Sequence, residues 1–174
     1  HDLMRLCPLP DLRFERLFVS MRSVLLINLE KVKASPELVY FLSTLSLHCF
    51  TNDYIYGEKE EETDLVDRLE NEIAQAIAKS EQPTSIKILC FSTYRPIHRY
   101  DWCKKLNRLD HLEEVKRRLI KEPLAEKTIA KEIATLGKVL DDVSYKVRKQ
   151  YEEHPYPRWV KLGIPKNAKS ISDI

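Results

Sequence analysis

Glycine is scarce in this sequence, with only three among its 174 residues: Gly57, Gly137 and Gly163. Loops that cradle phosphate groups or approach a nucleoside closely are rich in glycine, because a residue without Cβ lets the main chain come near the ligand. The shortage therefore argues against a nucleotide- or cofactor-binding loop within this chain.

Paired cysteines and long apolar runs are also missing. The four cysteines, Cys7, Cys49, Cys90 and Cys103, are far apart and form no CxxC pair. We interpret them as reduced thiols, and the protein as cytoplasmic. No apolar run approaches the roughly 20 residues that span a bilayer, and no segment has the pattern of a secretory signal. We therefore expect no membrane contact.

Neither sign of charge dominates, since 29 basic residues face 27 acidic ones. The basic residues form two small clusters, Lys116-Arg117-Arg118 and the dispersed Lys161, Lys166 and Lys169. The first adjoins Glu113 and Glu114, so we interpret it as a solvated helix face. A nucleic-acid-binding domain stays a lesser alternative, because phosphate-driven binding normally needs a gathered basic patch.

Apolar residues recur mostly at helical spacing. We expect about seven helices with short connections, which predicts an all-α helical bundle. The window 86–93 is too short for its periodicity to distinguish strand from helix, and we favour helix because no second convincing strand is available to pair with it. No 34-residue repeat can be aligned within the chain.

Capping residues predict where the first helices begin. Asp11 follows a proline and is expected to cap a helix that reaches about Val32. Its expected buried stripe consists of Leu12, Leu17, Met21, Val24 and Leu25, widened by Phe14 and Phe18, with Arg13, Arg16 and Arg22 at more polar positions. Ser35-Pro36-Glu37 predicts the next start. That second helix is apolar nearly all round, so we expect it to be the most buried.

The remaining helices are predicted from shorter patterns. The acidic run 58–62 leads into a helix with the stripe Leu65, Val66, Leu69, Ile73 and Ile77. We expect Asp110 to cap a helix that carries Leu112, Val115 and Leu119 and that Pro123 breaks. Two further stripes are expected on the last helices: Ile129, Ile133 and Leu136, then Val139, Val143 and Val147.

Few residues suggest catalysis or metal binding. Cys90, His98, Cys103 and His111 are spaced too widely for a typical structural zinc site, which uses tight pairs. Cys49 lies in an apolar pattern and is interpreted as a core residue. No GxSxG-type nucleophile turn occurs. We therefore predict no catalytic centre and no metal within this chain.

A proline- and aromatic-rich segment, residues 150–159, has the sequence QYEEHPYPRW. Its two prolines stiffen the backbone, and this lowers the ordering cost of recognition. The candidate binding residues are Tyr151, Tyr156, Arg158 and Trp159. The alternative is an aromatic hook that pins an extended C-terminal tail onto the helical body.

The same segment resembles the QYEENPYPRW signature of bacterial proteins that join tetratricopeptide repeats to a class I S-adenosylmethionine-dependent methyltransferase domain. Three further stretches resemble that family. Residues 41–62 are similar to its QCFLNEYVY…EE stretch, residues 94–98 to YRPLH, and residues 143–148 to VS..VR. His154 and His48 depart from the usual Asn and Gln.

The resemblance implies a role without a catalytic site in this chain. In that family the GCGTGQ-like cofactor loop follows the signature, and nothing similar occurs before Ile174. Residues 1–150 are then expected to form a helical accessory domain, and residues 151–174 a linker toward a downstream methyltransferase domain that binds S-adenosylmethionine. The start at His1, without an initiator Met, agrees with a piece of a larger protein. The segment with Tyr156, Arg158 and Trp159 is expected to cover the cofactor or substrate cleft.

A second function from another class is also open. The helices alone are compatible with a tetratricopeptide-like module that binds a protein partner. An exposed apolar groove lined by successive helices would favour this alternative, and a tightly closed bundle would count against it.

Overall fold

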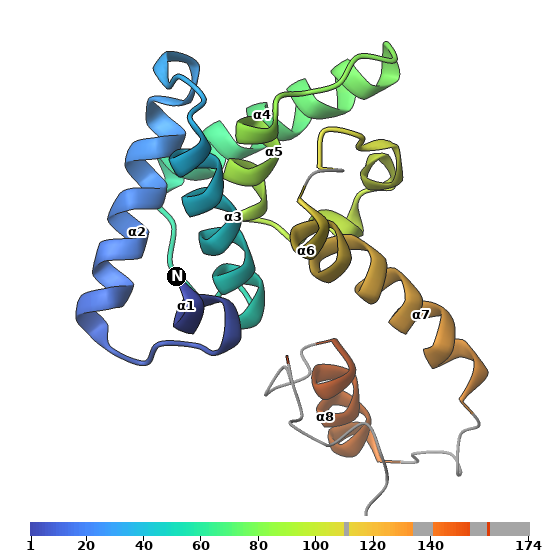
Figure 1. The fold of residues 1–174 in the computed structure, drawn as a ribbon. Helices are drawn as coiled ribbons and strands as arrows, with labels where there is room; N and C mark the ends of the chain where they lie inside the picture. The colour runs from blue at the N-terminus through green and yellow to red at the C-terminus, as the bar shows by residue number, and fades with distance from the viewer. Residues whose placement is uncertain (110–111, 134–140, 154–159, 161–174) are drawn as a thin grey trace, which may run out of the picture.

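The computed structural model describes residues 1–109, 112–133, 141–153 and 160 (Figure 1). The described residues form α-helices, short 3-10 turns and one π turn, and no strand occurs among them. The all-α prediction is confirmed. The predicted extended tail after residue 153 lies almost wholly outside the described residues.

Side-chain caps start the first long helices as predicted. A short helix α1 (Asp2–Leu6) precedes α2 (Leu12–Ile27), whose N-cap Asp11 accepts a hydrogen bond from the Arg13 backbone N–H at 2.8 Å. Helix α3 (Pro36–Thr51) begins with Ser35, whose hydroxyl accepts from the Leu38 N–H at 3.2 Å. Each cap satisfies one of the donors that a helix start leaves unpaired.

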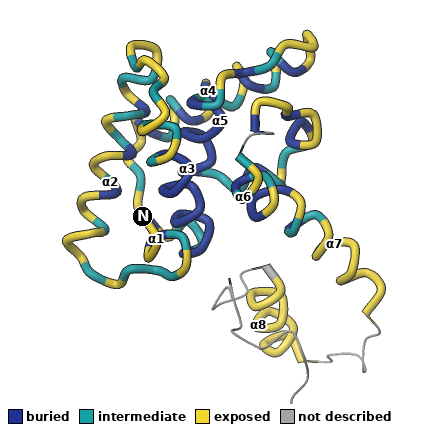
Figure 2. The backbone as a smooth tube through the Cα atoms, viewed as in Figure 1, coloured by how far each residue is buried: buried dark blue, intermediate teal, exposed yellow. Residues whose placement is uncertain are grey.

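Helix α3 forms the centre of the fold. Ten consecutive residues, Leu42 to Thr51, are buried, which confirms that this is the most buried helix (Figure 2). It packs against α1 on one side and against α5 (Ser85–Ser92) on another. The helix expected in the window 86–93 is therefore confirmed, and the strand alternative is wrong.

Helix α4 (Glu60–Ala78) closes the other side of the core. Its apolar stripe is buried as predicted at Val66, Leu69, Ile73 and Ile77. The 3-10 turns η2 (Ile97–Arg99) and η3 (Asp101–Lys105) follow α5 and return the chain to the core, with Trp102 donating to the Glu70 carboxylate at 3.0 Å.

The predicted orientation of α2 is confirmed at Phe18, which is buried, and at Leu25, which packs against the core, but it is wrong for the rest of the stripe. Its buried side chains are Phe18, Arg22 and Leu26, spaced four residues apart. The residues expected in the core, Leu12, Phe14, Leu17, Met21 and Val24, are 36–59% exposed. The helix is apolar on two faces, and the packing selects the face that carries the arginine because that guanidinium finds three backbone carbonyls, described below.

Pro123 does not end the helix in which it lies. Helix α6 (Glu113–Lys116), the π turn η4 (Arg117–Lys121) and α7 (Glu122–Glu132) follow one another without a break. A proline inside an α-helix clashes with the carbonyl four residues earlier, and a wider turn just before it relieves that clash. The expected Asp110 cap lies outside the described residues, and Leu112 holds the N-cap position.

The last two helices leave their apolar side chains in solvent. Helix α7 extends away from the other helices (Figure 1), and Ile129 and Ile133 are exposed, contrary to the predicted buried stripe. Helix α8 (Asp142–Glu153) is exposed over residues 142–152. Leu136 and Val139 lie outside the described residues. None of the described helices is both long and apolar enough to cross a membrane.

Helix α1 is held on α3 through a buried histidine. His48 Nδ1 lies 3.1 Å from the Met4 carbonyl oxygen and Nε2 lies 2.7 Å from the Tyr56 hydroxyl. The carbonyl can only accept, so Nδ1 carries the proton and the neutral ring accepts from Tyr56 at Nε2. Burial lowers the pKa of His48 from its ordinary 6.5.

This geometry predicts acid sensitivity. Because the folded pKa is lowered, the unfolded chain takes up a proton first as the pH falls below 6.5. We expect the free energy of unfolding, measured by urea titration, to fall below that pH by up to about 1.4 kcal/mol per pH unit until the folded pKa is reached. His48→Gln keeps a donor and an acceptor without titrating, so it should flatten this slope. An equal slope in that variant would contradict the assignment.

Candidate functional site

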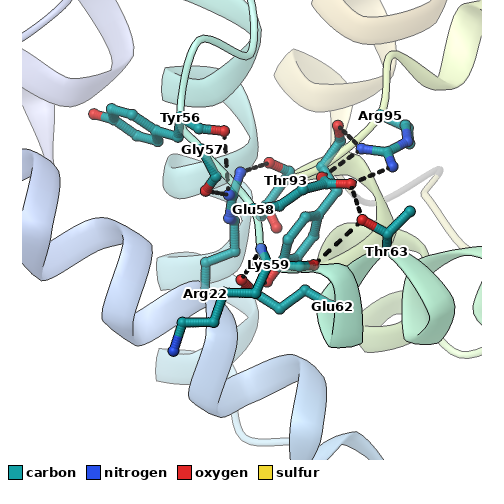
Figure 3. A network of polar contacts seen from close by, with 10 residues as sticks. Arg22, Tyr56, Gly57, Glu58, Lys59, Glu62, Thr63, Thr93 and Arg95 are labelled. Atoms are coloured by element: carbon teal, nitrogen blue, oxygen red, sulfur yellow. Dashed lines mark hydrogen bonds and ion pairs between the residues drawn. The ribbon is translucent and has the colours of Figure 1, made fainter.

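Two of the stretches that carry the family resemblance meet in space. The connector after α3, residues 52–59, lies beside residues 94–99 at the end of α5 and in η2. Each stretch supplies charged and aromatic side chains to the junction (Figure 3). We call this place the 53–99 junction.

The backbone of the connector is unusual. Asp53 and Tyr54 both have φ of 58°, in the left-handed region. A helix often ends on one left-handed residue, usually glycine. Here two non-glycine residues follow Asn52, and the Tyr54 N–H donates to the Cys49 carbonyl at 2.8 Å. Such residues cost roughly 1–3 kcal/mol when the side chain is bulky, so packing around Tyr54 must hold the turn.

Two carboxylates, those of Glu58 and Glu62, tie the connector and the start of α4 to the residues that follow α5. Arg95 donates from Nη1 and Nη2 to the two oxygens of Glu58, both at 2.7 Å, and Thr63 donates to Glu58 as well (Figure 3). Buried Glu62 accepts from the Lys59 N–H at 2.9 Å and from the Tyr94 hydroxyl at 2.8 Å. The guanidinium of Arg95 holds the pKa of Glu58 below its ordinary 4.5.

The side chain of Arg22, on α2, also reaches this junction and contacts the backbone of the connector. It is 2% exposed and donates to the carbonyls of Gly57 at 2.8 Å, Thr93 at 3.2 Å and Tyr56 at 3.4 Å (Figure 3). Its guanidinium carbon lies 4.0 Å from the centre of the Tyr94 ring. The charge is thus met by carbonyl oxygens and an aromatic face.

A small cavity of about 250 Å³ opens at the junction. Its lining is mixed, with two carboxylates, two guanidiniums, three tyrosines, one histidine and one proline: Asp53, Tyr54, Tyr56, Glu58, Tyr94, Arg95, Pro96, His98 and Arg99. The volume lies below the roughly 300–1,000 Å³ of typical ligand pockets. The cavity fits a small polar group or a single side chain of a partner.

The structure shows where the cysteines lie and how reactive their thiols are. Cys49 and Cys90 are core residues, and burial raises the pKa of each thiol to about 12. Thiols with so high a pKa stay protonated and are poor nucleophiles. Within the described ranges, no group of three or more His, Cys, Asp or Glu side chains is arranged to hold a metal ion. His111 of the rejected zinc set lies outside those ranges.

Of the candidate binding residues of the C-terminal segment, one lies among the described residues. Tyr151 lies on α8 and is 66% exposed. Tyr156, Arg158 and Trp159 lie outside the described residues, so their expected role as a cover stays a prediction.

The first basic cluster is not a continuous basic surface. Arg118 is buried, and Arg117 pairs with Glu122. The distribution gives no support to the nucleic-acid alternative at this cluster. Lys161, Lys166 and Lys169 lie in the part of the chain that the structure leaves undescribed.

Sequence reasoning missed Arg22 and the pairing of Glu58 with Arg95. The only signal for Arg22 was its position four residues from both Phe18 and Leu26, which are buried with it. Glu58 and Arg95 are 37 residues apart, and nothing local in the sequence links them.

Comparison with known proteins gives no match: no family model fits the chain, and no curated protein and no solved structure is significantly similar to it.

The Glu58–Arg95 pair yields a prediction at this site. Arg95→Ala should lower the free energy of unfolding by about 2 kcal/mol, because a half-buried carboxylate loses two charge-assisted hydrogen bonds. The pair stabilises the fold above the ordinary pKa of Glu58 and loses this effect as the pH falls through the lowered value. The measurement is urea unfolding at neutral pH, with exposed Arg99→Ala as the control. Equal effects of the two substitutions would contradict the prediction.

Proposed function

We propose that this chain is a non-catalytic helical accessory region of an S-adenosylmethionine-dependent methyltransferase, which shapes or covers the cofactor and substrate cleft of a downstream domain. The observation that supports this most is the 53–99 junction. Two residues that match the family pattern in separate stretches, Tyr94 and Glu62, are hydrogen-bonded there, and Arg95 of the second stretch pairs with Glu58, which lies between the matched residues of the first. The resemblance therefore falls on side chains that the fold requires together.

The chemistry of the described residues agrees with a role in binding and not in catalysis. The buried thiols have raised pKa values, and the carboxylates of Glu58 and Glu62 are occupied by Arg95, Tyr94 and the Lys59 N–H. A nucleophile needs a neighbouring base and an oriented partner. The junction offers charge-paired, largely structural groups in their place.

Titration calorimetry of S-adenosylmethionine tests the proposal directly. It compares the 174-residue chain with the same chain continued by its natural downstream sequence. We expect heat of binding only from the longer chain. Tight binding by the short chain would overturn the non-catalytic, cofactor-free role, and no binding by either would overturn the methyltransferase assignment.

The cover can be tested separately in the longer chain. We propose that Tyr156, Arg158 and Trp159, together with Tyr151, contact the cleft, because rigid aromatics beside a cation suit that task. Arg158→Ala with Trp159→Ala should weaken cofactor or substrate binding at least tenfold. Unchanged binding of both would refute the cover while leaving the accessory role intact.

A second candidate, a protein-interaction module, is favoured by the outer face of α2. Phe14, Leu17, Met21 and Val24 follow a 3-4-3 spacing and are 36–59% exposed. This repeat suits packing against another helix. The stripe is apolar, and it is the feature expected of a surface that binds a helical partner.

Methionine oxidation distinguishes the two candidates. The chain has two methionines, of which Met21 is 36% and Met4 is 8% exposed. Peroxide oxidises accessible methionine fastest, so Met4 serves as an internal control. If the downstream domain packs on α2, the oxidation of Met21 should slow severalfold in the longer chain. An unchanged rate would leave the stripe open for a separate protein partner.

A further inference from the structure

Helices α7 and α8 each carry an exposed apolar stripe with the same spacing. On α7 the stripe is Ala125 and Ile129, and Ile129 is 56% exposed; Ile133, the extended residue directly after the helix, is 68% exposed. On α8 it is Val143, Val147 and Tyr151, which are 67%, 45% and 66% exposed. Residues four apart lie on one helix face, so each helix presents an apolar ridge, and Ile133 follows the end of the α7 ridge.

We propose that α8 folds back on α7 as an antiparallel helical hairpin that covers both ridges. In one register Ile129 faces Val147 and Ala125 faces Tyr151, and Ile133, just beyond the end of α7, comes near Val143. The two helical pairs form together because both stripes repeat every four residues. A slip by one turn would place Lys121 against Tyr151 or leave one residue of each stripe uncovered.

The charges beside the ridges match in the same register. Glu126 of α7 and Arg148 of α8 fall on one flank, within a turn of facing each other. Glu132 and Lys146 fall on the opposite flank. Both pairs join opposite charges. Arg148 already contacts Glu152 at 2.6 Å, and Glu126 would approach it from the other helix.

The short connection between α7 and α8 favours this arrangement, and so do the charges beside the other exposed apolar stripe, that of α2. Nine residues, 133–141, join the two helices, and short connections between successive helices usually join antiparallel neighbours. The exposed stripe of α2 suits α8 less well. It is flanked by Arg13 and Arg16, which would face the positive charges of Lys146 and Arg148.

The hairpin has a consequence for the chain after α8. The C-terminal end of α8 would lie beside the first turn of α7, close to Glu122 and Pro123. The residues that follow Glu153 would then continue from the helical body and not from the tip of α7.

Disulfide trapping in the 174-residue chain tests the hairpin. Cys7 is replaced by serine, because the other native cysteines are buried. Ile129→Cys with Val147→Cys places two thiols across the expected contact. Ile129→Cys with Tyr145→Cys is the matched control, because Tyr145 lies on the opposite face of α8 and is 58% exposed. A disulfide needs Cα atoms roughly 4.4–6.8 Å apart, so we expect the first pair to form at least tenfold faster, within one chain.

Two results of the disulfide experiment would contradict the hairpin. A fast bond that appears only in dimers would show that the α8 of a second copy occupies α7, and would overturn folding within one chain. Equal rates for both pairs would show that α8 does not dock on this ridge. All the replaced positions except Cys7, which is half-buried, are exposed, so the variants should fold.

Hydrogen exchange gives an independent measurement. Glu126→Arg should speed the exchange of α8 amides severalfold, and adding Arg148→Glu should restore much of the protection. Lys131→Glu, on the outer face of α7, is the control and should change nothing. Fast α8 exchange in the unaltered chain, unaffected by any of these substitutions, would refute the hairpin.

Discussion

Arg22→Met is expected to lower the free energy of unfolding by about 3 kcal/mol, because buried carbonyls lose a charged hydrogen-bond donor. Arg22 donates to the carbonyl oxygens of Tyr56, Gly57 and Thr93, which belong to two separate segments. Methionine fills part of the volume and supplies no N–H group. The connector 52–59 should therefore loosen from the end of α5.

The effect has a natural limit. Burying a guanidinium costs desolvation energy, and methionine removes that cost together with the hydrogen bonds. The contact with the Tyr94 ring, worth roughly 0.5–2 kcal/mol in proteins, is lost as well. Lysine would not rescue the site, because a single ammonium cannot reproduce the planar fork of donors.

Urea unfolding followed by circular dichroism measures this change. Arg16→Met on the exposed side of the same helix is the control and should stay within about 0.5 kcal/mol. Hydrogen exchange should show faster exchange at residues 55–57 in the Arg22 variant. If Arg22→Met lowered the free energy of unfolding by less than Arg16→Met does, water would be replacing the guanidinium without cost, and the prediction would be wrong.

Arg118→Met should have an effect of similar size, about 3 kcal/mol, at the opposite side of α3. Arg118 lies in the π turn and is 4% exposed. It donates to the Arg5 carbonyl at 2.6 Å and to the Thr51 hydroxyl at 2.8 Å. Burial lowers the pKa of Arg118 to about 10, so the group is still charged at neutral pH.

The Arg118 variant should also release α1. The Arg5 carbonyl belongs to α1, the helix that His48 also holds through Met4, so loss of the Arg118 contact would leave Asp2–Leu6 less firmly anchored. Limited proteolysis near Cys7 should therefore become faster together with the loss of stability. Arg117→Met, at the exposed neighbour that pairs with Glu122, is the control. If Arg117→Met and Arg118→Met changed the free energy of unfolding and the proteolysis rate equally, the buried contacts of Arg118 would contribute no more to stability than the exposed pair of Arg117.

Local signals predicted the local structure well. The caps Asp11 and Ser35 located two helix starts, and the nearly all-round apolar pattern after Pro36 identified the central helix. These predictions succeed because capping and periodicity depend on residues within a few positions of one another.

Predictions failed where packing chooses between alternatives. Helix α2 has two apolar faces, and the buried one includes Arg22, whose partners are 34 to 71 residues away. No local pattern reports such partners. Pro123 was expected to break a helix, but a π turn accommodates it. The 53–99 junction was likewise hidden, because the resemblance identified both stretches without showing that they touch.

The π turn before Pro123 acts as an inserted residue in an otherwise continuous helix. Each added residue turns all that follows by about 100° about the helix axis. The five residues Arg117 to Lys121 therefore set the direction in which the Ala125–Ile129 ridge of α7 points from the body. Removing one residue there would restore a regular helix and rotate the ridge by more than a quarter turn about the helix axis. The direction in which the apolar ridge of α7 faces therefore depends on one additional residue in the π turn.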